Sequence, residues 1–240
     1  MWEKKLLVKF LNNWEEYWRG SSPINTDLQV LLLEKTIRIT SGGYAQSKKI
    51  DNFNSTVGYW YYQATAADLS GIKKPRILVL GFGGGTIGML LKKKYPQAII
   101  DGVEIDPKMI ELGKSYLDLK EGDFNIFIED AMSFLKKTKE KYDYICVDLY
   151  IGSKTPEEID SEAFYQRVKK ILNAGGQVSV NRIYERGSRL ERLDLFSAGE
   201  KEYKKFLKLF SKLFKTTKVV EVPSQFFSKN YILSEESKWN

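Results

Sequence analysis

The segment at residues 76–106, RILVLGFGGGTIGMLLKKKYPQAIIDGVEID, constrains the fold of this chain more than any other. An apolar, β-branched run at 77–80 leads into a glycine-rich turn, then a helix-length segment, then a second apolar run that ends in Glu104. This order predicts a β-α-β unit, in which a helix joins two parallel strands. A glycine-rich turn inside such a unit is typical of sites for nucleotide or nucleoside cofactors.

The glycines of this turn indicate how a ligand is held. They are Gly81, Gly83, Gly84 and Gly85. Glycine permits positive φ and lets a ligand approach the backbone closely. The helix expected at about 85–94 presents unpaired N–H groups and a positive dipole end, which suit an anion or a carboxylate. Because Gly83, Gly85 and Gly88 also satisfy GxGxxG, a nicotinamide-dependent dehydrogenase stays open as an alternative.

Three acids each end a predicted strand: Glu104, Asp130 and Asp148. The alternation of strands and helices predicts a parallel sheet covered by helices on both faces, with ligands at the carboxyl ends of the strands. At such an end Glu104 can accept both hydroxyls of a ribose. Asp148 is our candidate for orienting or deprotonating an acceptor, and a simple loop or helix-cap acid is the alternative. Asn181, at the end of QVSVNRI, either faces the same crevice or packs.

Further elements follow from local signals. Asp106-Pro107 predicts the start of a helix, and SEAFYQRVKKILNAGG (161–176) predicts a helix closed by its double glycine. Aromatic and leucine side chains between 203 and 214 recur at helical spacing and should face the core. The runs at 218–222 and 226–234 predict an antiparallel hairpin at a sheet edge, joined near Pro223-Ser224.

The N-terminal segment predicts a helix over residues 2–20. Leu7, Leu11, Trp14 and Trp18 recur at helical intervals, and further apolar side chains broaden the stripe. Such a stripe usually docks on its own domain. A homodimer contact and a lid over an acceptor pocket are the alternatives.

Composition excludes several kinds of chemistry. The chain has no histidine and a single cysteine, Cys146, inside an apolar strand pattern. We therefore expect no metal site, no disulfide and no histidine-activated nucleophile, which leaves acid–base work to Asp, Glu, Tyr and Lys. We interpret the net charge of +7 as a lysine-rich solvated surface rather than a nucleic-acid site. Without a membrane-spanning apolar run, a cytoplasmic protein is expected.

The motifs occur in the order LGFGGGT, VEIDP, EDA, YDYICVD, a helix, a double glycine and VSVN. This order resembles the spermidine synthase family and its neighbours among the class I S-adenosylmethionine-dependent methyltransferases, over residues 37–233. The resemblance implies an α/β, Rossmann-like methyltransferase sheet of order 3-2-1-4-5-7-6 with an antiparallel last strand. It also implies that the glycine loop holds the donor's tail, Glu104 the ribose and Asp130 the adenine amino group.

The N-terminal half resembles the family as well. LLLEKTIRITSGGYAQS fits its β-hairpin region, with Gln46 at the glutamine position, and GYWYYQATAADL fits the helix that follows. The donor-binding residues implied are Gln46, Gly81, Gly83, Gly84, Gly85, Glu104, Ile105, Asp130, Ala131 and Asp148. Tyr61, Tyr62, Gln63 and Tyr150 are the residues assigned to the acceptor pocket. Residues 1–50 are expected to form a small appendage and residues 51–240 the transferase domain.

Four acids of the family are missing from this chain, at the positions of Val57, Gly58, Gly84 and Ile151. In the family such acids bind a cationic diamine and the ammonium tail of decarboxylated S-adenosylmethionine. Two opposite unit charges about 4 Å apart attract by roughly 4 kcal/mol at an effective dielectric constant of 20, so their loss weakens diamine binding. Intact S-adenosylmethionine carries a carboxylate instead, which suits a glycine-rich backbone.

We therefore expect a group transferase that uses a sulfonium donor, with methyl transfer to a small acceptor favoured. The enzyme mainly positions donor and acceptor for in-line displacement and supplies a base where one is needed. The alternatives are a polyamine aminopropyltransferase that uses decarboxylated S-adenosylmethionine and a non-catalytic nucleoside-binding protein.

Overall fold

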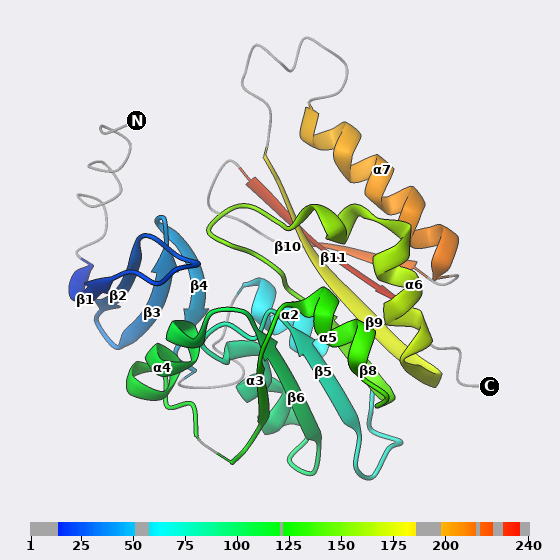
Figure 1. Cartoon of the computed structure of the whole chain (residues 1–240), viewed down its shortest axis with the longest axis horizontal. Coiled ribbons are helices and arrows are strands. Elements are labelled where there is room, and N and C mark those ends of the chain that lie inside the picture. The colour runs from blue at the N-terminus through cyan, green and yellow to red at the C-terminus, as the bar shows by residue number, and fades with distance from the viewer. Residues whose placement is uncertain are drawn as a thin grey trace.

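The computed structural model describes residues 14–50, 58–120, 122–185, 198–214, 217–222 and 228–235 (Figure 1). Two sheets organise this part of the chain, one of four strands and one of seven. The smaller sheet is antiparallel, and its strands are β1 (Glu15–Gly20), β2 (Leu28–Leu33), β3 (Thr36–Ser41) and β4 (Tyr44–Lys48). None of the helices in the described ranges is long and apolar enough to span a membrane.

The larger sheet carries the predicted β-α-β unit at its centre. Its order is β10-β11-β9-β8-β5-β6-β7, and the five strands from β9 to β7 run parallel. β11 is antiparallel to both of its neighbours. The bounds are β5 (Arg76–Leu80), β6 (Ile99–Glu104), β7 (Asn125–Ile128), β8 (Tyr142–Val147), β9 (Leu172–Glu185), β10 (Thr217–Val222) and β11 (Ser228–Glu235). The expected α/β class is confirmed.

Helices cover both faces of this sheet. They are α2 (Tyr59–Thr65), α3 (Thr86–Lys94), α4 (Pro107–Tyr116), α5 (Ala131–Lys137), α6 (Glu162–Lys170) and α7 (Ala198–Leu213), with a short 3₁₀ helix, η2 (Glu157–Asp160). One face packs against α5, α6 and α7, and the other against α2 and α3. The predicted aromatic face of α7 is confirmed, because Phe206, Phe210 and Phe214 are all buried in the first of these cores.

The small sheet is tied to the large one through α4. As predicted, Asp106 caps this helix by accepting a hydrogen bond from the Lys108 N–H (3.0 Å), with Pro107 in the first turn. The Asp106 carboxylate also accepts hydrogen bonds from Ser22 Oγ (2.5 Å) and Asn25 Nδ2 (2.6 Å). The carboxylate is completely buried, so these three donors are what compensates its desolvation. One side chain thus caps a helix and anchors the N-terminal segment.

The helix predicted for residues 2–20 is wrong over residues 15–20. Residues 15–20 form β1, in which Trp18 pairs with Val30 across an antiparallel ladder. Trp18 packs against a core that includes Leu28, Val30 and Ile39. The tertiary pairing therefore overrides the local helical spacing. Residues 1–13 lie outside the described part of the chain.

The double glycine does not close α6. The helix ends at Lys170, and Ile171 is its C-cap residue. Gly175 and Gly176 instead lie early in β9, where the register against β8 shifts between Tyr142 and Tyr144. Gly175 has a φ of 75°, which suits a glycine in such an irregular stretch. The predicted hairpin is confirmed in β10 and β11, and its turn lies outside the described residues.

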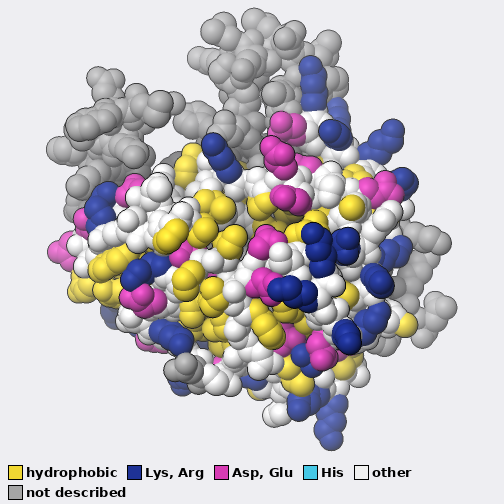
Figure 2. All heavy atoms as spheres, viewed as in Figure 1, with side chains coloured by type: hydrophobic (Ala, Val, Ile, Leu, Met, Phe, Trp, Pro, Cys, Tyr) yellow, Lys and Arg dark blue, Asp and Glu magenta, His cyan; other side chains and the backbone are white. Residues whose placement is uncertain are grey.

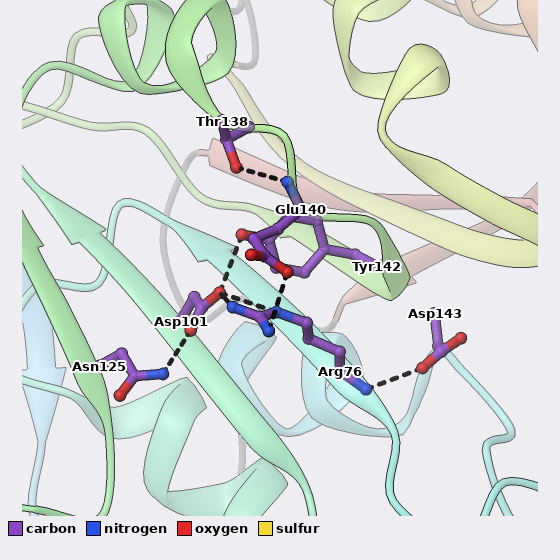
Figure 3. A network of polar contacts seen from close by, with 7 residues as sticks. All are labelled: Arg76, Asp101, Asn125, Thr138, Glu140, Tyr142 and Asp143. Carbon is purple, nitrogen blue, oxygen red and sulfur yellow. Dashed lines mark hydrogen bonds and ion pairs between the residues drawn. The ribbon is translucent and has the colours of Figure 1, made fainter.

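A polar network fills the end of the sheet where the parallel strands begin (Figure 3). At its centre the Asp101 carboxylate accepts hydrogen bonds from Arg76 Nη2 (2.8 Å), Tyr142 Oη (2.9 Å) and Asn125 Nδ2 (2.8 Å). Arg76 also pairs with Glu140 at 3.0 Å. Asp101 is completely buried. Arg76 and Asn125 lie on the two strands that adjoin β6, and Tyr142 reaches the carboxylate from β8, which lies beyond β5. The network joins the strand beginnings of β5, β6, β7 and β8.

Candidate functional site: a pocket at the carboxyl edge

A pocket opens at the opposite end of the sheet, where the parallel strands stop. Its lining comes from the loops after β5, β6, β7 and β8 and from η2 and α6. The residues are Gly81, Val103, Glu104, Ile105, Glu129, Asp130, Ala131, Met132, Leu149, Tyr150, Ile151, Pro156, Glu158, Ile159 and Phe164. On the face that Figure 2 shows, Lys and Arg side chains gather on the right, over α5 and α6. Six of the residues predicted for the site line this pocket.

Glu104 reaches the pocket from the end of β6. Its Oε2 accepts a hydrogen bond from the Gly83 N–H (2.7 Å), and its Oε1 accepts one from the Asp106 N–H (2.9 Å). The side chain is 9% exposed. Burial raises the pKa of Glu104 above its ordinary value, and the two backbone donors act in the opposite direction. Each carboxylate oxygen keeps a further lone pair, so the group can still accept a hydroxyl.

Asp130 lies at the next strand end, one position before α5. It caps this helix by accepting a hydrogen bond from the Ser133 N–H (2.8 Å) through Oδ1. Its side chain is exposed and lines the pocket together with the buried Ala131. Two of the three predicted strand-end acids, Glu104 and Asp130, therefore line one pocket and follow separate strands.

The glycine loop is more closed than the sequence suggested. The N–H groups of Gly81 and Phe82 donate to Val103 O, and that of Gly85 donates to Phe82 O. The N–H of Gly83 donates to Glu104, and that of Gly84 donates to Ser47 Oγ (2.7 Å). All five loop amides are satisfied within the protein. Strand-end and side-chain acceptors already occupy these donors, so the loop at 81–85 has no free amide for a ligand. The anion site expected at the first N–H groups of the following helix stays a prediction.

Gly84 is packed rather than exposed to the pocket. A Cβ at this position would lie 2.9 Å from Ile39 Cδ1, 2.9 Å from Leu117 Cδ1 and 3.0 Å from Ser47 Cβ. Real Cβ atoms are rarely that close to another heavy atom, so the ends of the Ile39 and Leu117 side chains would have to shift to admit even a methyl group. Position 84 therefore has no acid, and the packing around it leaves no room for the side chain of one.

Gly88 has a packing role that accounts for the GxGxxG match. A Cβ there would lie 2.5 Å from Phe82 Cε2, and one at Gly102 would lie 2.3 Å from Phe82 Cδ2. Phe82 is buried against both glycines and against Phe124, whose ring centroid is 5.4 Å away. The third glycine of the pattern therefore makes room for an aromatic ring. Because packing against Phe82 accounts for Gly88, the GxGxxG match at this loop does not by itself support a dinucleotide site.

Asp148 lies just beyond β8, beside the pocket and on the side of the sheet that faces α2. Its Oδ1 accepts a hydrogen bond from Asn181 Nδ2 (2.9 Å). Burial raises the pKa of Asp148 to about 7; the bond from Asn181 lowers it, and the nearby charge of Glu104 raises it. Tyr59, at the start of α2, lies close enough that Asp148 adds to the effect of burial in raising its pKa. Asp148 is thus a carboxyl group suited to exchange a proton near neutral pH.

The residues predicted for the acceptor pocket divide into two groups. Tyr150 lines the pocket, and its hydroxyl accepts a hydrogen bond from the Ile183 N–H (2.8 Å). Tyr61 and Tyr62 lie on α2, partly buried, with their rings edge to face at 5.9 Å. Gln63 is completely buried and bonded within the core, so its assignment as a substrate contact is wrong. The helical period turns this residue inward, toward β8 and β9.

Gln46 joins the small sheet to the loop that follows β8. Its Nε2 donates a hydrogen bond to Gly152 O at 3.0 Å. This loop also contains a bridge between Ile151 and Lys154 and ends in η2. Gln46 is therefore placed at the loop that borders the pocket and is not itself part of the lining.

Several lining residues were not found from the sequence. Leu149, Pro156, Ile159 and Phe164 belong to the segment after β8, in which local spacing does not indicate which side chains face a pocket. Ser47, which bonds to Gly84, carried no signal of its own. For Asn181 the sequence allows either a place in the crevice or a packing role, and in the structure its side chain contacts Asp148. The lining suits an adenosine, because it offers a carboxylate for the ribose, apolar side chains for the ring faces and Asp130 for the amino group.

The fold and the position of the pocket place the chain among Rossmann-like α/β proteins of the methyltransferase type. Residues 61–229 match the family model described as the spermine/spermidine synthase domain. This match covers most of the chain, and the chain belongs to this family. The matched residues include the whole parallel sheet and the pocket.

Relatives agree with this placement. A "probable polyamine aminopropyl transferase" of Bifidobacterium longum is 33% identical over 150 residues, which are 62% of this chain and 33% of the relative. A structure titled as a "probable spermidine synthase" from Corynebacterium glutamicum has a TM-score of 0.72 at 19% identity, covering 92% of this chain and 78% of that one. Human methyltransferase-like protein 13, in complex with SAH, has a TM-score of 0.53 at 23% identity, covering 70% and 73%.

The chain spans only about a third of the length of the Bifidobacterium relative. The two solved structures show likeness of fold alone at these identities. What this chain binds and transfers is therefore a separate question from its family.

Proposed function

We propose that the chain is an aminopropyltransferase, which moves the aminopropyl group of decarboxylated S-adenosylmethionine to an amine acceptor. The observation that carries the proposal is Asp148, a carboxyl group with a pKa raised to about 7 beside a pocket that suits an adenosine. The family and the name of the Bifidobacterium relative favour aminopropyl transfer over the methyl transfer that the sequence suggested. The small sheet then belongs to the appendage at residues 1–50, and residues 51–240 form the transferase domain.

In this proposal Asp148 acts on the acceptor. The amine nitrogen attacks the propyl carbon next to the sulfonium, a C–N bond forms, and the C–S bond breaks. The sulfur leaves with its electron pair as neutral methylthioadenosine, and Asp148 accepts the proton that the amine loses. The donor is already activated by its positive sulfur, so the remaining task of the protein is positioning.

The other residues then divide by position. Glu104 is assigned to the ribose and Asp130 to the adenine amino group, with Gly81, Ile105 and Ala131 completing the donor side. Their shared place in one pocket supports this assignment. Tyr150, Tyr61 and Tyr62 remain acceptor-side proposals. Gln46 and the closed glycine loop are proposed to shape the donor site from behind rather than to bind through free amides.

Methyl transfer from intact S-adenosylmethionine is a second candidate, and one observation favours it. Gly84 has neither an acid nor the space for one, so this position offers no counter-charge to the ammonium tail of the decarboxylated donor. An ammonium held in a buried site without a partner is strongly disfavoured.

Calorimetry with the two donors separates these candidates. Titration of intact and decarboxylated S-adenosylmethionine into the chain should show tighter binding of the decarboxylated form, and mass spectrometry of an amine acceptor should show an added aminopropyl group. Tighter binding of the intact donor together with a methylated product would replace aminopropyl by methyl transfer. If NAD alone raised the melting temperature, both transferase candidates would be lost.

A further inference from the structure

A buried polar cluster lies behind Asp148, between the sheet and α2. Its members are Gln63, Tyr144, Cys146 and Ser179, and none of them has any exposed surface. They come from α2, β8 and β9, so the cluster joins three elements that are far apart in sequence. Polar side chains this deep in a core need partners, because an unpaired polar group loses its hydrogen bonds to water.

Gln63 provides most of those partners. Its Nε2 donates to Val147 O (3.1 Å), and its Oε1 accepts from Ser179 Oγ (2.5 Å) and Cys146 Sγ (2.8 Å). Its main-chain carbonyl accepts from Tyr144 Oη (2.6 Å). The amide orientation follows from chemistry, because only the NH₂ group can donate to the Val147 carbonyl. A single side chain therefore clamps the end of β8 to β9 and to α2.

This clamp lies next to the proposed base. Val147 directly precedes Asp148. Side chains two residues apart along an extended chain point to the same face, so Cys146 shares a face with the residue at 148 and Ser179 shares a face with the residue at 181. The residues at these positions, Asp148 and Asn181, are joined by the 2.9 Å hydrogen bond. The placement of the end of β8 relative to the middle of β9 therefore decides whether that bond forms.

We infer that Gln63 is a positioning residue, which holds the end of β8 against the middle of β9 so that Asn181 orients the Asp148 carboxylate toward the acceptor. The inference rests on the proposed role of Asp148. Gln63 touches neither the pocket nor the reacting atoms and acts only through the strands that it joins. A fully bonded cluster in a low-dielectric core is rigid, which suits a group that must be held within a fraction of an ångström.

Gln177 offers a matched control on the same face of β9. It lies two residues before Ser179, on the side away from Asn181, and is 5% exposed. Its Nε2 donates to Asp68 O (2.8 Å), and its Oε1 accepts from the Asp68 N–H (3.4 Å). Like Gln63 it is a buried amide that joins two backbone segments, but at a position further from the carboxyl edge. A purely structural role predicts the same behaviour for both.

The test compares Gln63→Met with Gln177→Met in the full chain, because methionine keeps the length of glutamine and removes its hydrogen bonds. Both variants should lose stability. We expect Gln63→Met alone to lower kcat, by about tenfold or more, the size of a lost buried hydrogen bond. Its KM for the donor should stay within about twofold, since the donor pocket is untouched. An unchanged kcat in Gln63→Met, or an equal loss in Gln177→Met, overturns the inference.

Two further measurements keep the inference testable on its own. A crystal structure of Gln63→Met should show Asn181 Nδ2 and Asp148 Oδ1 beyond hydrogen-bonding distance, whereas a retained contact overturns the inference whatever the activity. If Gln63→Met does not fold, Ser179→Ala removes one donor to the cluster and should lower kcat by about threefold without changing donor KM; an unchanged kcat again overturns it. Failure of the proposed function shows separately, as full turnover in Asp148→Asn.

Discussion

Two carboxylates on β6 lie three residues apart and behave differently. Asp101 and Glu104 are both buried, at 0% and 9% exposure. Asp101 accepts hydrogen bonds from three side chains on other strands, Arg76, Asn125 and Tyr142 (Figure 3). Within the described residues Glu104 accepts bonds only from backbone N–H groups, and it lines the pocket. A buried acid surrounded by side-chain partners holds strands together, whereas one held by the backbone at a strand end keeps capacity for a ligand.

The difference follows the direction of the strands. In a parallel sheet the strand beginnings meet at one end, and the loops that carry function leave from the other. The acids at the carboxyl end, Glu104, Asp130 and Asp148, lie at or beside one pocket. Substitutions at the two ends should therefore separate: those at the pocket end should change binding or turnover, and those at the network end should change stability.

Asp148→Asn should have the largest effect. Asparagine keeps the size of the side chain and its contact with Asn181 but cannot accept a proton, so kcat should fall by about 10²–10⁴-fold. Calorimetry should give a donor Kd within about threefold of the wild type. Full turnover in this variant would remove Asp148 from the mechanism.

Asp101→Asn should instead change stability. Replacing the carboxylate leaves Arg76 without its buried partner, and the free energy of unfolding should fall by about 3 kcal/mol. Urea unfolding monitored by tryptophan fluorescence measures this loss. The donor Kd should stay within about twofold, because the network lies at the far end of the strands. A variant that binds the donor poorly while keeping its stability would contradict the division between the two ends.

Glu104→Gln should show the reverse behaviour. Loss of the charge-assisted bonds to the ribose should weaken donor binding by about tenfold or more. Stability should fall by about 1–2 kcal/mol, less than in Asp101→Asn, because glutamine can accept only one of the two backbone N–H bonds while burial already disfavours the charged form of Glu104. Calorimetry and urea unfolding on the same preparation give both numbers. Unchanged donor affinity would place the ribose elsewhere.

The pH dependence of turnover tests the proton acceptor. A base works only in its charged form, so activity should be lost as pH falls through the raised pKa of Asp148, about 7. Between pH 8 and pH 6 the charged fraction falls by about tenfold, and kcat/KM should follow after division by the neutral fraction of the acceptor amine. A flat corrected profile over this range would show that no group with such a pKa takes the proton.

Gly84→Ala should have the smallest effect. The added methyl group lies against Ile39, Leu117 and Ser47, so stability should fall by about 1–2 kcal/mol while these side chains shift to admit it. Thermal unfolding measures this change, and Gly122→Ala is not a suitable control because Gly122 has a positive φ. Gly71→Ala, where nothing lies within 4 Å of the added Cβ, is the matched control. Equal stability of the two variants would show that Gly84 is less tightly packed.

Local signals in the sequence were enough to find the β-α-β unit and its strand-end acids. Glycines, apolar runs and the Asp106-Pro107 pair act over a few residues, and the structure contains each of them. The remaining features depend on contacts between distant segments. Trp18 is in a strand because it pairs with Val30, and Gln63 points into the core because β8 and β9 lie there. Neither partner can be read from local spacing.

The loop amides show the same limit at the site itself. Glycine content predicts that a backbone can approach a ligand, but it does not show which acceptors the amides already have. Ser47, nearly forty residues before the loop, takes the Gly84 N–H, and Glu104 takes that of Gly83. The sequence was enough to predict that the pocket lies at the carboxyl edge of the sheet. It did not show that the amides of the glycine loop are already bonded within the protein.

The most direct measurement is a crystal structure of the chain with methylthioadenosine, the nucleoside product of the proposed reaction. We expect the ribose hydroxyls within hydrogen-bonding distance of Glu104, the adenine amino group near Asp130 and the sulfur on the side of Asp148. A nucleoside bound elsewhere, or no bound nucleoside at a saturating concentration, would contradict the assignment of this edge of the sheet as the donor site.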